Sequence, residues 1–159
     1  MDRNVPSERV VRAHTPLPPE QLKFRGMHGS ESLSQLFELE VELVSESYSL
    51  DMKSLLGKPL TLEIETAADG PRYLSGHITR CVLVGRENNT SRYTIYRATL
   101  RPWLWYLTQT SDNKIFQNKS VPEVIREVLK DYNYPVEFKL VDTYRSWEYC
   151  VQYQETDYA

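Results

Sequence analysis

The chain has 159 residues, of which 40% are hydrophobic and 26% are charged, with a formal net charge of −3 and a pI near 5.7. This length fits one domain with its own core, and no apolar run reaches the roughly 18 residues that a transmembrane helix needs. The acidic balance argues against a protein that binds nucleic acids by neutralising phosphates. The charged start, MDRNVPSERVV, lacks the apolar region of a signal peptide. We therefore expect assembly in the cytoplasm, with any export by a route that reads no signal.

The first hundred residues predict a series of short strands. An alternation of apolar residues with Glu38, Glu40 and Glu42 indicates a half-buried strand that buries Phe37, Leu39, Val41 and Leu43. Further strands are predicted at residues 9–14, 21–27, 59–66, 73–86 and 92–100. Turns are predicted at Gly26, Gly29 and Ser30 and at residues 67–71 and 87–90. Residues 50–56 predict a short helix that ends at Gly57, and Gly76 predicts a bulge or bend.

The region after residue 100 contains the structural anchors that we predict. Pro102 ends a strand because it has no backbone N–H, and Trp103, Leu104 and Leu107 follow at helical spacing. A polar loop is expected next. Ser120 and Glu123 then form a capping box, and the helix that they begin carries Ile125 and Leu129 on its apolar side.

Two more strands, at residues 135–141 and 147–153, complete the predicted fold. The fold class is mainly β: an antiparallel curled sheet or β-barrel with one capping α-helix. We expect residues 1–159 to form a single domain that is truncated at its C-terminal end. Thr156 or Asp157 would begin a helix that does not follow.

No pattern in the sequence predicts a catalytic, metal or cofactor site. His14, His28 and His77 are widely separated and lie in no metal-binding motif. The three glutamates of the alternating strand are about 6.6–6.8 Å apart, too far to share one ion. We expect Lys23 and Arg25 to neutralise them instead. Cys81 and Cys150 are interpreted as buried reduced thiols.

Several blocks carry a resemblance when they are read in order. They are LPPEQLKFRGMHGSESLSQLFELEVELVSES, LLGKPLTLEIE, RYLSGHITR, LRPWLWYLTQTSDNKIFQNKSVPEVIREVL and YCVQYQETD. Together they resemble the N-terminal hub region of VgrG proteins, the spikes of bacterial type VI secretion systems, which is similar to the hub of contractile-phage baseplates. Where the family usually has Ser-Arg before Ile-Phe-Gln, this chain has Asn113-Lys114. Lysine keeps the charge but loses the bidentate fork.

The resemblance implies a structural role rather than an enzymatic one. Family members form homotrimers whose six barrels meet the hexameric Hcp tube ring, and sheath contraction drives the spike into a target cell. Baseplate proteins would be further partners. Effectors or adaptors would attach through C-terminal regions that this chain lacks, and the family's enzymatic activities lie there too. No cofactor and no nucleic-acid partner are expected, and the resemblance assigns no particular residues to the interface.

Two other readings stay open on the residues alone. A small β-barrel module could bind oligosaccharide or single-stranded nucleic acid through some of the 11 tyrosines. It would need an exposed aromatic stripe on one sheet face. A hydrolase would need a nucleophile within hydrogen-bond reach of His77.

Overall fold

The computed structural model describes residues 10–66, 70–86, 88 and 92–159. The chain divides into two compact units, Met1–Pro102 and Trp103–Ala159, which are described separately below. That they act together as one hub domain stays a prediction. The turns expected at residues 67–71 and 87–90 fall largely outside the described residues. Within the described ranges, no helix is long and apolar enough to cross a membrane.

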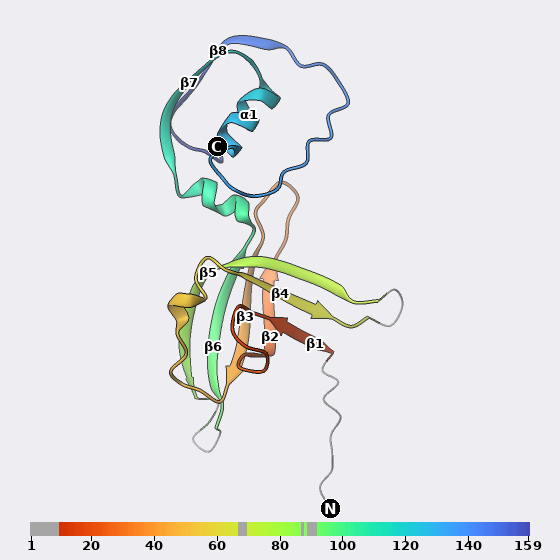
Figure 1. Cartoon of the computed structure of the whole chain (residues 1–159), viewed down its shortest axis with the longest axis vertical. Coiled ribbons are helices and arrows are strands. Elements are labelled where there is room, and N and C mark those ends of the chain that lie inside the picture. Colours follow the sequence, from red (N-terminus) through yellow and green to blue (C-terminus); the bar gives the residue numbers. More distant parts are fainter. Residues whose placement is uncertain (1–9, 67–69, 87, 89–91) are drawn as a thin grey trace, which may run out of the picture. The chain divides into compact units, whose positions relative to one another are not determined.

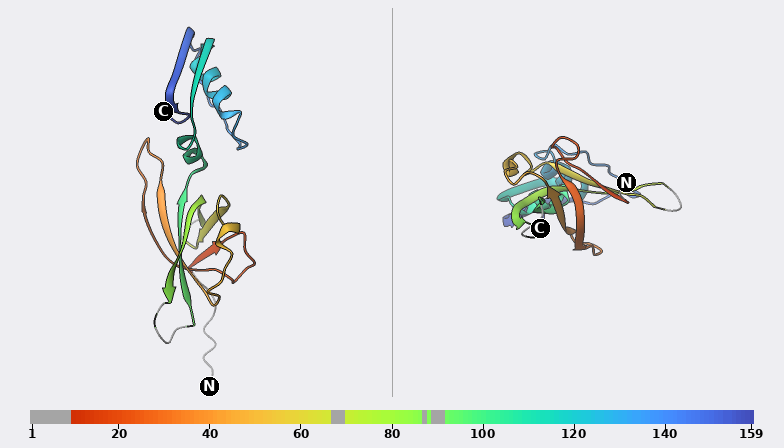
Figure 2. Two further views of the ribbon diagram at one scale, coloured as in Figure 1. Left: turned by 90° about the vertical axis from the view of Figure 1, so that its left-hand side faces the viewer. Right: turned by 90° about the horizontal axis from the view of Figure 1, so that it is seen from below.

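The first unit contains an antiparallel sheet of six strands that curls into half of a barrel (Figures 1 and 2). Its strands are β1 (Val11–His14), β2 (Lys23–Ser30), β3 (Glu38–Ser45), β4 (Pro59–Ile64), β5 (Arg72–Arg86) and β6 (Thr94–Arg101). They lie in the order β1-β4-β5-β6-β3-β2. The predicted curled antiparallel sheet is therefore confirmed, with β1 and β2 as its two edges.

One face of this sheet forms the core. Its buried side chains come from four strands and include Leu39, Val41, Leu43, Leu60, Leu62, Ile78, Tyr96, Ala98 and Leu100. Their spacing of two residues within each strand is the alternation that the sequence shows most clearly in β3. The Tyr96 hydroxyl donates to Ser47 O at 2.9 Å and accepts from Leu50 N at 3.4 Å, so this buried phenol has hydrogen-bond partners.

The glutamates of β3 lie on the other face and are ion-paired. Glu42 accepts from Arg25 at 2.6 Å and from Arg97 at 2.8 Å, and these partners, Arg97 first, lower the pKa of its carboxyl. Arg101 pairs with Glu38. The expected pairing of Arg25 is confirmed. Lys23 instead contacts Glu20, because it lies beside Val44 in the sheet register, beyond the glutamates.

Three local predictions in the first unit need correction. β2 runs on through Gly26, Gly29 and Ser30, which were expected to form a turn. The helix expected at residues 50–56 is a single 3₁₀ turn, Met52–Ser54, although Gly57 has the left-handed φ of +73° that the prediction requires. The bulges of β5 lie at Ile78/Arg80 and Leu83/Gly85 rather than at Gly76. A Cβ on Gly76 would lie 3.1 Å from Leu100 Cβ, so close packing explains this glycine.

The second unit contains a 3₁₀ segment (Trp103–Thr108), β7 (Ser111–Ser120), α1 (Val121–Leu129) and β8 (Ser146–Thr156). The expected helix and the last strand are confirmed. The expected polar loop before the helix is wrong, because residues 111–120 form β7 and pair with β8. The strand expected at residues 135–141 is also wrong, since these residues form no regular structure. α1 packs against β7 of its own unit.

We predict that Gly29→Ala destabilises the first unit by about 1–3 kcal/mol. A Cβ at Gly29 would lie 2.4 Å from the backbone oxygen of Glu38, whereas a Cβ at Gly26 would meet nothing within 4 Å. Gly26→Ala on the same strand is the matched control, and it should change stability by less than about 0.5 kcal/mol. Urea denaturation of both variants measures the difference. Equal effects would contradict the close approach at Gly29.

Candidate functional site

The two strands of the second unit give their sheet two different faces. β7 and β8 pair antiparallel, with Ile115 opposite Val151 and Lys114 opposite Gln152. Because successive side chains point to opposite faces, Phe116 shares one face with Lys114 and Gln152, while Ile115 and Val151 share the other. Phe116 and Gln152 are buried. α1 therefore covers the first face, which we call the inner face.

The opposite face is apolar and exposed. We call it the aromatic face and define it by five residues, with their exposed fractions: Ile115 (67%), Trp147 (47%), Tyr149 (66%), Val151 (51%) and Tyr153 (68%). At about 200 Å² for each aromatic side chain, the three rings alone expose roughly 350 Å². The largest contiguous apolar patch on a typical monomer is about 300–600 Å² and is often functional. This face therefore has the character of a contact surface.

The inner side contains a hollow of about 500 Å³ beside α1. Four of the predicted anchors line it, namely Leu104, Leu107, Ile125 and Leu129. The structure thus brings together residues that lie up to 25 positions apart in the sequence. Leu107 is buried but Ile125 remains 44% exposed. The apolar stripe of α1 is consequently only partly covered.

Trp103, a further predicted anchor, contacts an aromatic residue that the sequence analysis did not single out. Its ring stacks on Tyr134 with the centroids 5.0 Å apart and an interplanar angle of 21°. Tyr106 lies parallel to the same ring at 6.2 Å. Tyr134 follows α1 in a segment without regular structure, so no periodic pattern could have marked it. Pro102, the last residue of the first unit, directly follows β6, as predicted.

The predicted capping box at the start of α1 is confirmed. Ser120 is the N-cap residue, and the Glu123 carboxylate accepts from Ser120 N and from Ser120 Oγ, both at 2.7 Å. These hydrogen bonds to Ser120 lower the pKa of Glu123 below its usual 4.5. Pro122 lies in the first turn of the helix, where a missing N–H leaves no helical bond unmade.

Lys114, which the sequence analysis singled out, lies on β7 beside two carboxylates. Its Nζ lies 3.3 Å from Asp112 Oδ2 and 3.8 Å from Asp131 Oδ2. The contact with Asp112 raises the pKa of Lys114, and the pKa of Asp112 is lowered, first by Asn113 N and then by Lys114. The ammonium group of Lys114 therefore links Asp112 on β7 to Asp131 after α1. It acts as a point charge, whereas an arginine could form a bidentate pair with a carboxylate.

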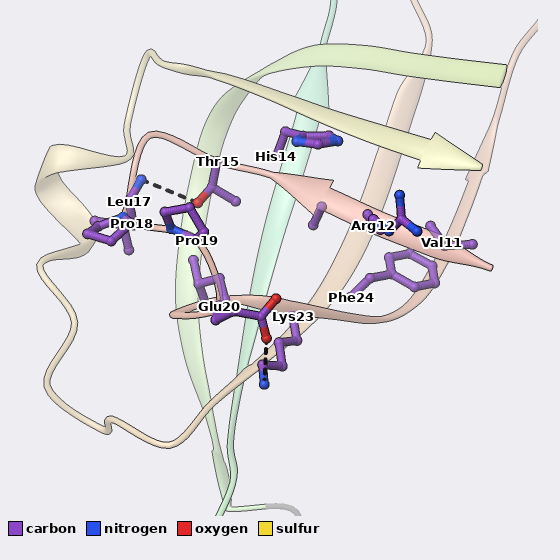
Figure 3. A pocket seen from close by; sticks show the side chains of 12 residues that line it. Val11, Arg12, His14, Thr15, Leu17, Pro18, Pro19, Glu20, Lys23 and Phe24 are labelled. Carbon is purple, nitrogen blue, oxygen red and sulfur yellow. Dashed lines mark hydrogen bonds and ion pairs between the residues drawn. The ribbon is translucent and has the colours of Figure 1, made fainter. Parts of the chain in front are cut away.

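A second hollow, of about 410 Å³, lies in the first unit beside the edge strands β1 and β2 (Figure 3). Two cationic side chains and a histidine line it, and each has a carboxylate partner: Arg12 with Glu65, Lys23 with Glu20, and His14 with Glu63. Phe24 contributes an apolar wall from β2. Because these side chains pair with one another, we interpret the hollow as the open side of the half-barrel, beside its edge strands β1 and β2, and not as a ligand site.

The remaining candidate groups of the sequence analysis do not converge. His28 pairs with Glu40 at 3.1 Å, and His77 Nδ1 lies 3.3 Å from Gly57 O. Among the described residues, no three His, Cys, Asp or Glu side chains are placed to hold a metal ion. Both cysteines are free thiols, but Cys150 is exposed and Cys81 is half-buried, so their predicted burial is wrong. Cys81 packs against the core of the first unit, and Cys150 lines the hollow beside α1.

The chain thus combines a curled antiparallel sheet, ion-paired on one face, with a second unit whose aromatic face is exposed. The chain belongs to the phage tail baseplate hub family (GPD), whose model matches residues 30–159. It is 43% identical to the type VI secretion system spike protein VgrG1c and 44% identical to VgrG1a, both from Pseudomonas aeruginosa, over 94% of this chain. VgrG3 of Vibrio cholerae is 30% identical over 89% of the chain.

A solved structure shows the same fold. The chain superposes on the E. coli protein c3393 with a TM-score of 0.70 and 25% identity over 86% of this chain. That protein is described as a type VI secretion component with structural similarity to the T4 phage tail proteins gp27 and gp5. The chain spans only 20% of VgrG1c, 23% of VgrG1a and 40% of the c3393 chain. The resemblance to the VgrG hub region is confirmed.

We predict that Ser120→Ala costs about 0.5–2 kcal/mol of stability at pH 7. The folded-state pKa of Glu123 is lowered, so the charged capping box stabilises the helix above pH 4.5 and this contribution is lost as the pH falls through the folded pKa. Thermal melts of wild type and variant should therefore differ more at pH 7 than at pH 3. An unchanged melting temperature at pH 7 would contradict the capping role.

We predict that Trp103→Ala destabilises the second unit by about 3 kcal/mol, because it removes a partly buried ring stacked on Tyr134. Trp147→Ala is the control, since Trp147 lies on the exposed aromatic face, and it should cost less than about 1 kcal/mol. Urea denaturation monitored by near-UV circular dichroism measures both. Equal losses in the two variants would refute the anchoring role of Trp103.

Proposed function

We propose that this chain is the hub portion of a type VI secretion spike and acts as a structural element without catalysis of its own. Membership of the baseplate hub family supports this, as does the similarity to several spike proteins over most of the chain. Enzymatic activity in such spikes would lie in C-terminal regions outside residues 1–159.

In this proposal three copies of the full-length protein form a trimer that docks on the hexameric Hcp tube ring. Baseplate proteins surround the hub during assembly in the cytoplasm, and contraction delivers the spike into the target cell without a signal peptide. Effectors or adaptors attach through the C-terminal regions. The similarity to a structure described as resembling T4 tail proteins supports this phage-like arrangement.

The observation that carries the proposal is the aromatic face of β7 and β8. A two-stranded sheet is marginally stable alone. Here α1 supports only the inner face, so the aromatic face is left for a packed partner. Tyr149 and Val151 lie near the middle of this face and are more than half exposed. An assembly subunit buries such a surface when its neighbours bind.

The same face favours a second candidate function. Trp147, Tyr149 and Tyr153 lie along one strand face and are exposed. Exposed aromatic rings of this kind can stack on sugars or single-stranded bases. Two features count against this reading. Ile115 and Val151 lie opposite each other on this face and offer no polar contact. The net charge of −3 disfavours a phosphate backbone.

We predict that Tyr149→Glu combined with Val151→Glu prevents trimer formation of the full-length protein. Two carboxylates introduced into an apolar interface would have to be desolvated without partners. Light scattering should give a trimer for wild type and a smaller species for the variant, and the variant should no longer co-sediment with Hcp rings. Circular dichroism should show an unchanged fold in the variant.

The matched control is Val141→Glu, which changes a side chain that is 98% exposed and lies outside both strands. It should form trimers and bind rings like wild type. A wild-type protein that stays monomeric and never engages the rings would refute the hub proposal. Quenching of Trp147 fluorescence by a short oligosaccharide or oligonucleotide, with trimers unaffected by the double variant, would favour the binding module instead.

A further inference from the structure

The second unit closes at one end through side chains that the proposed function does not use. Ser111 at the start of β7 pairs with Thr156 at the end of β8, whereas Ser120 pairs with Ser146 at the opposite end. Two-stranded ladders fray from their ends. The end at Ser111 and Thr156, which we call the open end, therefore needs contacts beyond the ladder to stay closed.

Asp157 supplies these contacts. Its backbone N–H donates to Thr110 O at 3.1 Å and so extends the ladder by one bond. Its carboxylate accepts from Gln152 Nε2 at 2.9 Å through Oδ1 and from the Tyr132 hydroxyl at 2.8 Å through Oδ2. We call these four residues, Thr110, Tyr132, Gln152 and Asp157, the Asp157 latch.

The latch joins three segments that are distant in the sequence. Thr110 precedes β7, Tyr132 lies just after α1, and Asp157 follows β8. The backbone N–H of Tyr132 donates to Leu129 O at 3.0 Å, so Tyr132 is fixed to the last turn of the helix. Release of the Asp157 carboxylate would therefore free the end of β8 and the end of α1 together.

Gln152 makes the latch costly to open. It is one of few buried polar side chains in the described residues, with 8% of its surface exposed. Its amide nitrogen donates to both Asp157 Oδ1 and Glu155 O, the latter at 3.2 Å. A buried donor that loses its partners bears the full cost of desolvation. The latch thus replaces apolar packing at an end of the unit where little is buried.

We propose that the Asp157 latch is a clamp that prevents β7 and β8 from separating at their open end. Tension between the start of β7 and the end of β8 would load the ladder one pair at a time, and the latch would be the first group of contacts to resist. The clamp holds the end of α1 in the same way. It follows from contacts within the unit and stands whether or not the chain is a secretion hub.

Hydrogen exchange on the full chain tests the clamp in Tyr132→Phe, which removes only a hydroxyl, and in Asp157→Asn. Amides at the open end, including Asp157 and Thr156, should exchange about tenfold faster in each variant, the factor expected for a lost hydrogen bond to a charged group. Amides of β3 in the first unit should be unchanged. The double variant should exchange no more than a few-fold faster than either single variant, since both release one latch.

Tyr153→Phe is the matched control, because its ring lies on the aromatic face of the same strand and is 68% exposed. It should exchange like wild type. A second readout is the phenol pKa of Tyr132, which burial and Asp157 raise above 10; Asp157→Asn should lower it. Open-end amides that exchange at wild-type rates in both variants would overturn the clamp. Equal acceleration throughout the second unit would also overturn it.

Discussion

Burial of one face of the neighbouring interior strands β3 and β6 is the interaction on which the first unit depends. The register sets Leu43 opposite Tyr96, Val41 opposite Ala98 and Leu39 opposite Leu100, all of them buried. Full burial of a large apolar side chain stabilises by about 1.5–3 kcal/mol, so these residues contribute on the order of 10 kcal/mol. The ion pairs on the opposite face contribute at most about 1 kcal/mol each. Apolar burial therefore holds the sheet, and the ion pairs favour one register over a slip that would expose the leucines.

The second unit follows a different rule because it buries so little. Leu107, Phe116, Pro122 and Gln152 are its buried residues within the described chain. Specific contacts of modest strength take the place of a core: a capping box, stacked rings and polar side chains between distant segments. Such contacts fix geometry well but add little net free energy. The second unit therefore has a well-defined geometry but little stabilisation from apolar burial.

The sequence predicted the fold where one physical signal dominated. β3 was predicted because its leucines and glutamates alternate without interruption, and α1 because a capping box begins an apolar stripe. β7 was missed because most of its residues are polar on both the aromatic face and the inner face. Apolar and polar residues therefore do not alternate around Ile115 as they do in β3. The strand expected at residues 135–141 was wrong for the opposite reason: its apolar residues alternate, but no neighbouring strand pairs with them. Strand pairing is a tertiary property that local pattern cannot supply.

The candidate site was less predictable than the fold, and the cause is physical. The sequence predicts a buried face for Tyr149, Val151 and Tyr153, since apolar residues at alternating positions are typical of a core strand. Only the structure shows that α1 lies on the other side of the sheet and leaves these residues exposed. A permanent interface resembles a domain core cut in half, so its residues carry a core signature in a single chain. In a subunit of an assembly, the apolar residues that the fold leaves uncovered say the most about function. Local sequence patterns cannot distinguish these residues from those of a core.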